Sequence, residues 1–138
     1  MSEEERRAFL SQGTRTGKLA TVRRDGRPHV VPIWFVLDGD DLLFTTAANT
    51  VKGRSLLRDG RAAICVDLQE EPYAYVMVEG EVAISRDLDE MLVWTTKIAA
   101  RYEGEDAAEE YGRRNAVEGE LLVRLRPANV VAVHMVDD

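Results

Sequence analysis

The sequence has few of the residues that mark a secreted, membrane-inserted or metal-dependent protein. Its one cysteine, Cys65, lies in an apolar run, so we predict a small core residue in a reducing compartment and not half of a disulfide. No apolar run approaches the ~20 residues that span a bilayer. The first residues alternate acidic and basic side chains and do not form the apolar segment of a signal peptide. The sequence therefore predicts a cytoplasmic protein.

The chain also lacks a basic stripe. Its formal net charge is −7, and the acidic residues gather at 3–5, 87–90 and 103–110. Without lysines and arginines arranged to neutralise a phosphate backbone, nucleic-acid binding is not expected. At 138 residues, the chain is predicted to form a single domain over 1–138.

The motifs of protein-based catalysis are absent as well. The sequence contains no HExxH, no CxxC and no cluster of histidines and carboxylates, so no metal site is predicted. It has no GxSxG nucleophile motif, and its two histidines, His29 and His134, are far apart and are expected to be structural. If the protein is an enzyme, we expect a bound cofactor to supply the chemistry.

Apolar alternation predicts a fold that is mainly β. The expected strands cover 18–23, 30–37, 42–46, 61–68, 73–85, 121–125 and 130–136. Helices are expected over 3–11, 50–59, 88–102 and 105–114. Asp25-Gly26 predicts a hairpin turn, and Gly80 predicts a bulge. The pattern favours a six- to seven-stranded antiparallel barrel with capping helices.

Three local features lead to more specific expectations. Segment 30–37 is apolar almost throughout, so both of its faces should be covered, one by the core and the other by a helix, a ligand or another chain. Trp94 lies off the apolar stripe of its helix, which favours a contact with a partner chain or a lid over a partly exposed surface ring. Pro127 and Asn129 predict a turn between the last two strands.

Residues 42–66 contain the best candidate for a binding site. A strand, a polar turn, a helix capped by Asn49 or Thr50 and a second strand follow one another, so the helix N-terminus should suit a phosphate. Nearby side chains supply cations and hydroxyls: Lys52, Arg54, Thr45, Thr46 and Thr50. Lys52 and Arg54 lie about 200° apart on an ideal helix, so an ordinary solvated helix is the alternative.

Six short stretches carry a family resemblance through their order and spacing. They are Leu19-Ala20-Thr21, Asp25-Gly26-Arg27-Pro28-His29, Val31-Pro32-Ile33-Trp34-Phe35, Phe44-Thr45-Thr46, the 52–59 helix with Lys52, Arg54, Leu56, Arg58 and Asp59, and Val78-Glu79-Gly80. Together they resemble the flavin- and deazaflavin-binding split β-barrels of the pyridoxamine 5′-phosphate oxidase-like superfamily. The chain is most similar to the actinobacterial branch that uses coenzyme F-420, a deazaflavin.

This resemblance implies a homodimer with a cofactor groove to which both chains contribute. The implied cofactor-binding residues are Pro32, Ile33 and Trp34 against the ring, Thr45 and Thr46 beneath it, Lys52 at the phosphate with Thr50, Val51 and Arg54 beside it, and Tyr75 from the opposite subunit. Tyr75 is also the candidate proton donor. Thr50 stands where many relatives have an arginine, a loss that would weaken phosphate binding by about 1.5–3 kcal/mol if nothing replaces it.

The resemblance favours an oxidoreductase that transfers a hydride between reduced coenzyme F-420 and a conjugated small-molecule acceptor. An FMN-dependent oxidoreductase of the same fold is one alternative. A non-catalytic carrier of a flavin, haem or tetrapyrrole is the other.

Overall fold

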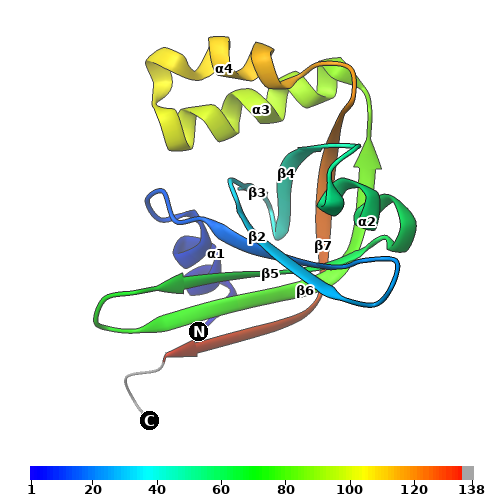
Figure 1. Ribbon diagram of the computed structural model, residues 1–138. Coiled ribbons are helices and arrows are strands. Elements are labelled where there is room, and N and C mark those ends of the chain that lie inside the picture. The colour runs from blue at the N-terminus through cyan, green and yellow to red at the C-terminus, as the bar shows by residue number, and fades with distance from the viewer. Residues whose placement is uncertain (135–138) are drawn as a thin grey trace.

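The computed structural model describes residues 1–134 and shows a seven-stranded antiparallel sheet curled into a split barrel, with helices at its ends (Figure 1). The strands are β1 (Gly17–Val22), β2 (Pro28–Ile33), β3 (Val36–Asp38), β4 (Asp41–Ala47), β5 (Arg61–Leu68), β6 (Ala74–Ser85) and β7 (Glu120–His134). The helices are α1 (Glu3–Ser11), α2 (Val51–Asp59), α3 (Leu88–Glu103) and α4 (Ala108–Asn115), with a 3₁₀ turn, η1 (Glu105–Ala107), before α4. The expected fold class is confirmed.

The two edge strands of the sheet are consecutive in the chain. The strand order is β2-β1-β5-β6-β7-β4-β3, and only Trp34 and Phe35 separate β2 from β3. The prediction of one strand over 30–37 is therefore wrong. The physical reason lies at Phe35, whose side chain is fully buried and whose N–H and C=O both bond to side chains of α3 instead of a neighbouring strand.

The two longest strands, β6 and β7, bend together at a bulge. Glu79 pairs with Asn129 and Gly80 pairs with Pro127, so one residue of β7 is left over. A Cβ at Gly80 would lie 2.0 Å from the carbonyl oxygen of Arg126, which explains why glycine is needed there. The expected bulge is confirmed, but the expected turn at 127–129 is wrong because β7 is continuous and the bulge absorbs the proline. Residues 135–136 of the last predicted strand lie outside the described residues.

The barrel interior holds the main core. Its largest fully buried side chains come from the linker between β2 and β3, the strands and α2, and include Phe35, Phe44, Leu19, Ile64 and Leu56. The prediction that Cys65 is a core residue is wrong. Alternation along β5 places its side chain on the opposite, outer side of the sheet, where it is partly buried. Partial burial there still raises the pKa of its thiol.

Helices α3 and α4 form an antiparallel pair above the sheet (Figure 1). Gly112 permits their close contact, since a Cβ there would lie 2.3 Å from Thr96 Oγ1, and Thr95 Oγ1 donates to the Gly112 carbonyl at 2.8 Å. Trp94 packs partly buried against Leu43, Met91 and Leu122 of its own chain. The Trp94 ring is thus partly exposed, and its contact with a partner chain or a lid stays a prediction. No helix within residues 1–134 is long and apolar enough to cross a membrane.

One face of the sheet has no covering element within residues 1–134. It consists of the outward-pointing residues of β2, β1, β5, β6 and β7, and we call it the outer sheet face. One register row across it is Val30, Ala20, Ala63, Glu79 and Asn129. The second face of segment 30–37 is covered only in part, because Trp34 stacks on Tyr102 of α3 whereas Val30 is 66% exposed. For the Val30 end, a ligand or another chain stays the prediction.

Candidate functional site

A groove of about 380 Å³ opens between the end of β2, β4 and the α3–α4 pair. Its lining residues are Pro32, Ile33, Trp34, Thr45, Thr95, Ile98, Ala99, Tyr111 and Asn115. The structure thus brings together four of the residues predicted to contact a cofactor ring, from β2, the linker that follows it and β4. The α3 and α4 residues were missed because their helical spacing indicated only core packing. Tyr111, an aromatic residue within the polar sequence of α4, was the one signal that could have found them.

Trp34 forms an aromatic wall of this groove. Its indole stacks on the Tyr102 ring with centroids 4.8 Å apart and planes within 1°. The Tyr102 hydroxyl accepts from the Phe35 N–H at 3.3 Å and donates to the Arg15 carbonyl at 2.8 Å. Burial raises the pKa of Tyr102, so its phenol stays protonated at neutral pH. Tyr102 occupies one side of the indole. Trp34 nevertheless remains 42% exposed, which leaves area for a second ring.

Arg101 fixes the backbone that carries Trp34. Its guanidinium donates to the carbonyls of Gly13, Phe35 and Leu10 at 2.9, 2.7 and 2.8 Å. It also lies 4.7 Å from the centroid of the Phe35 ring. Burial lowers the pKa of Arg101, yet an arginine remains cationic at any physiological pH. The Arg101 side chain therefore connects α3 to the linker and to the end of α1. These bonds hold the backbone at Trp34 in place before any ligand binds.

The start of α2 is built as the sequence predicts, with Thr50 as its N-cap. Thr50 Oγ1 accepts from the Gly53 N–H at 3.1 Å and donates to the Ala47 carbonyl at 2.7 Å. Thr46 is only 4% exposed, and its hydroxyl lies 3.2 Å from that of Thr50. These two hydroxyls bond inside the protein, whereas Thr45 alternates to the groove side of β4.

The backbone N–H groups of Val51 and Lys52 at this helix start have no hydrogen-bond partner within residues 1–134. Lys52 is half-buried and forms no salt bridge in the described chain. Burial raises the pKa of Glu120, and the charge of Lys52 opposes that shift, although the two side chains form no ion pair within residues 1–134. Glu120 pairs with Ala47, two residues beyond Thr45 on β4, a separation of roughly 7 Å along a strand.

The remaining predicted site residues lie elsewhere. Val51 and Arg54 line a different cleft, beside the β1–β2 hairpin, so Arg54 and Lys52 face different sides of α2. Tyr75 is on the outer sheet face, where it pairs with Asp67 and Val133, and it is not among the residues that line the groove. Within residues 1–134 no three His, Cys, Asp or Glu side chains come close enough to hold a metal ion.

Comparison with known proteins assigns the family. The sequence model of the pyridoxamine 5′-phosphate oxidase family matches residues 2–134. The chain belongs to the pyridoxamine 5′-phosphate oxidase family. This family includes oxidoreductases, and some of its members bind flavins or F420.

Solved structures of similar proteins agree with this assignment. A protein described as an F420 reductase is 30% identical, with a TM-score of 0.70, over 90% of this chain and 94% of its own. A conserved hypothetical protein of Mycobacterium tuberculosis is 25% identical, with a TM-score of 0.84, over 97% of this chain and 85% of its own. A heme-binding protein of Mycobacterium smegmatis shares the fold at 24% identity and a TM-score of 0.71, over 97% of this chain and 55% of its own.

Proposed function

We propose that two copies of this chain bind reduced coenzyme F-420 between them and act as an oxidoreductase on a flat, conjugated acceptor such as an enone, a quinone or a tetrapyrrole. The observation that carries the proposal is the juxtaposition of an aromatic wall with a cationic helix start. Trp34 offers indole surface in the groove, and Thr45 lines the same groove. Ala47, two residues after Thr45 on β4, pairs with Glu120, whose carboxyl group senses the charge of Lys52. The 30% identity to an F420 reductase supports the same cofactor.

The residues of the chain fit such a cofactor at both of its ends. Lys52 and the unbonded N–H groups of Val51 and Lys52 present three donors to a phosphate at the positive end of the α2 dipole. Ile33 and Trp34 present apolar and aromatic surface to a ring. Thr50, which stands where the family resemblance implies an arginine in many relatives, caps the helix start and adds no cation to the phosphate site.

When bound, F-420 would supply the hydride. The chain's own residues would orient the ring against Trp34, hold the phosphate at Lys52 and keep water from the reacting face. The groove, at about 380 Å³, is at the lower end of the range for ligand pockets, and we propose that a second chain completes it. The partner subunit's Tyr75 is the candidate proton donor.

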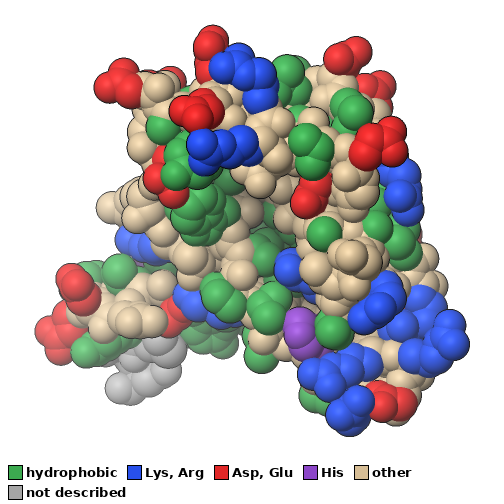
Figure 2. All heavy atoms as spheres, turned by 45° about the horizontal axis from the view of Figure 1, so that its top comes forward, with side chains coloured by type: hydrophobic (Ala, Val, Ile, Leu, Met, Phe, Trp, Pro, Cys, Tyr) green, Lys and Arg blue, Asp and Glu red, His purple; other side chains and the backbone are tan. Residues whose placement is uncertain are grey.

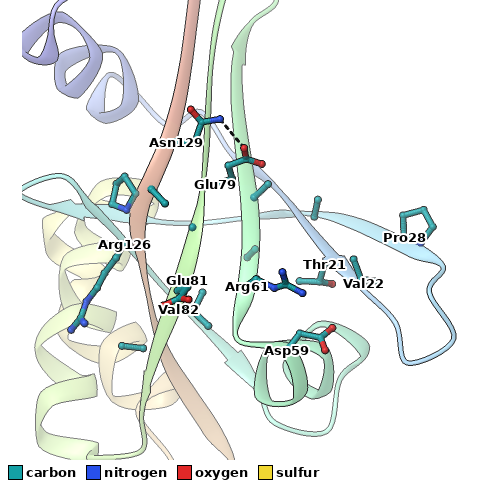
Figure 3. A pocket seen from close by; sticks show the side chains of 17 residues that line it. Thr21, Val22, Pro28, Asp59, Arg61, Glu79, Glu81, Val82, Arg126 and Asn129 are labelled. Carbon is teal, nitrogen blue, oxygen red and sulfur yellow. Dashed lines mark hydrogen bonds between the residues drawn. The ribbon is translucent and has the colours of Figure 1, made fainter.

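The outer sheet face is the surface that we propose for this second copy. Apolar and small side chains of β2, β1 and β5 form one part of it, among them Val30, Val22, Ala20 and Ala63, and Glu79 and Asn129 continue the same row on β6 and β7. It contains a hollow of about 940 Å³ rimmed by Arg61, Glu79, Glu81 and Arg126 (Figure 3). A rim that carries both signs of charge can complement itself across a two-fold axis.

Anaerobic titration of the purified apoprotein with F-420 and with FMN tests the cofactor. We expect F-420 to bind at least tenfold more tightly, and the reduced complex to recover its oxidised absorbance when a conjugated acceptor is added. Tighter binding of FMN would favour the FMN-dependent alternative. Binding without oxidation by any member of a panel of enones, quinones and tetrapyrroles would favour a carrier.

Glu120→Gln is expected to raise cofactor affinity roughly three- to tenfold at neutral pH, because the variant removes a carboxylate that competes for Lys52. Since burial raises the pKa of Glu120, the folded protein holds that proton more tightly than the unfolded chain, and stability falls as pH rises through the raised pKa. Glu120→Gln should not lose stability as the pH rises through this range. It should therefore melt higher than the wild type at neutral pH, and the difference should close below the ordinary pKa of glutamate.

Fluorescence titration and thermal melts over a pH series measure both effects of Glu120→Gln. Glu118→Gln is the matched control, because it removes the same charge from an exposed position two residues away. An equal gain in affinity in both variants would show a general charge effect and no specific competition at Lys52.

A further inference from the structure

The α4 side of the groove carries two polar side chains with unused hydrogen-bonding capacity. Tyr111 and Asn115 both line the groove, and their i, i+4 spacing places them on one face of α4. Asn115 Nδ2 donates to the Tyr111 carbonyl at 2.8 Å, and this bond holds the amide in place. The amide oxygen, the second amide N–H and the Tyr111 hydroxyl have no partner within residues 1–134.

The other residues of α4 do not line the groove. Ala108 and Gly112 are buried, and Gly112 packs closely on Thr96 of α3. The four charged residues of α4 pair with one another at i, i+4 spacing, with nitrogen–oxygen distances of 3.9 and 2.8 Å. Figure 2 shows acidic and basic side chains mixed over the upper part of the molecule, where the α3–α4 pair lies in Figure 1. Tyr111 and Asn115 are therefore the residues with which α4 meets a ligand in the groove.

Most of the remaining groove lining is apolar. Ile33, Ile98 and Ala99 are buried there. The Thr95 hydroxyl already donates to a backbone carbonyl of α4 at 2.8 Å, and Thr45 is the polar residue that β4 contributes. A pocket of this composition holds the flat body of a ligand against its apolar walls and orients it through a few polar groups.

We propose that Tyr111 and Asn115 bind the carbonyl oxygen of the acceptor and thereby select enones and quinones of one or two rings. This inference rests on the proposed function, in which the cofactor ring packs against Trp34. The Tyr111 O–H and the second N–H of Asn115 are donors, and one carbonyl oxygen accepts two hydrogen bonds. That oxygen gains negative charge as the acceptor is reduced, which the same donors stabilise. At about 380 Å³, the groove suits such an acceptor better than a tetrapyrrole.

Titration of the apoprotein with 1-indanone and with indane, followed by ligand-observed NMR, tests this carbonyl site. The two probes share a flat bicyclic body, and only 1-indanone carries a carbonyl oxygen. We expect Tyr111→Phe to weaken 1-indanone binding roughly three- to tenfold, the value of one hydrogen bond, and to leave indane affinity within twofold. Asn115→Ala should show a loss of the same order, which tests the second donor independently.

Tyr73→Phe is the matched control, because it removes the same hydroxyl from an exposed tyrosine that does not line the groove. Its affinity for both probes should stay within twofold of the wild type. An equal loss in this control, or a loss for indane as large as that for 1-indanone, would overturn the proposal. Unchanged 1-indanone binding in Tyr111→Phe and Asn115→Ala, or no binding to the wild type, would also overturn it.

Titration of the wild type and the two α4 variants with F-420 separates this inference from the proposed function. We expect all three to bind F-420 equally, because neither residue is assigned to the phosphate or to the Trp34 wall. Normal F-420 binding together with unchanged 1-indanone affinity in the variants would overturn the carbonyl site alone. Absence of F-420 binding by the wild type, with 1-indanone affinity lost in both variants, would overturn the proposed function and support the carbonyl site.

Discussion

Val30→Asp is expected to convert the proposed dimer into single chains and to abolish cofactor binding. Val30 is 66% exposed at the centre of the uncovered β2 edge, so the isolated chain has no packing to lose there. In a two-fold interface the new carboxylate would be buried twice, at a cost of several kcal/mol. Because Val30 points away from the barrel interior, the fold of each chain should persist.

Sedimentation velocity, circular dichroism and cofactor titration of the same Val30→Asp sample measure these effects. Val93→Asp is the matched control, because Val93 is 51% exposed on α3 and lies away from the outer sheet face. We expect this control to remain dimeric and to bind cofactor normally. A Val30→Asp protein that sediments as the wild type does, or a wild type that is itself a single chain, would contradict the proposed interface.

Lys52→Ala is expected to weaken cofactor affinity by roughly 10- to 150-fold, the value of one charge-assisted hydrogen bond to a phosphate. Thermal stability should change little, because Lys52 forms no salt bridge within residues 1–134 and a partly exposed charge contributes at most about 1 kcal/mol. Fluorescence titration and a melting curve of the same sample separate the two effects.

Lys97→Ala provides the comparison for Lys52→Ala, since Lys97 is an exposed lysine on α3 whose ammonium group lies over the Trp94 ring. Its cofactor affinity should equal that of the wild type. If Lys52→Ala also binds as the wild type does, the phosphate is held elsewhere, and the proposed role of Lys52 is wrong.

Local chemistry predicted much of the fold. The Thr50 cap and the Gly80 bulge depend on residues within a few positions of each other or on one close backbone contact, and both are present. The break at Phe35 was missed because its bonding partners are 66 and 67 residues away, in α3. The side of the sheet that Cys65 occupies was also missed, since an apolar run does not show which alternate positions point inward.

The sequence predicts one side of the groove and misses the other. The family resemblance located Pro32, Ile33, Trp34 and Thr45, which the structure places together. The α3 and α4 sides of the groove depend on the packing of a helical pair against β4, which no local pattern encodes.

The linker of Trp34 and Phe35 has a mechanical consequence. No main-chain hydrogen bonds pair β2 with β3, and the side chains of Arg101 and Tyr102 instead hold the linker between these two edge strands. Substituting these two side chains would remove the hydrogen bonds to the linker without breaking any main-chain hydrogen bond between strands of the sheet. We therefore expect substitutions on α3 to change the width of the groove beside Trp34 while the rest of the barrel stays intact.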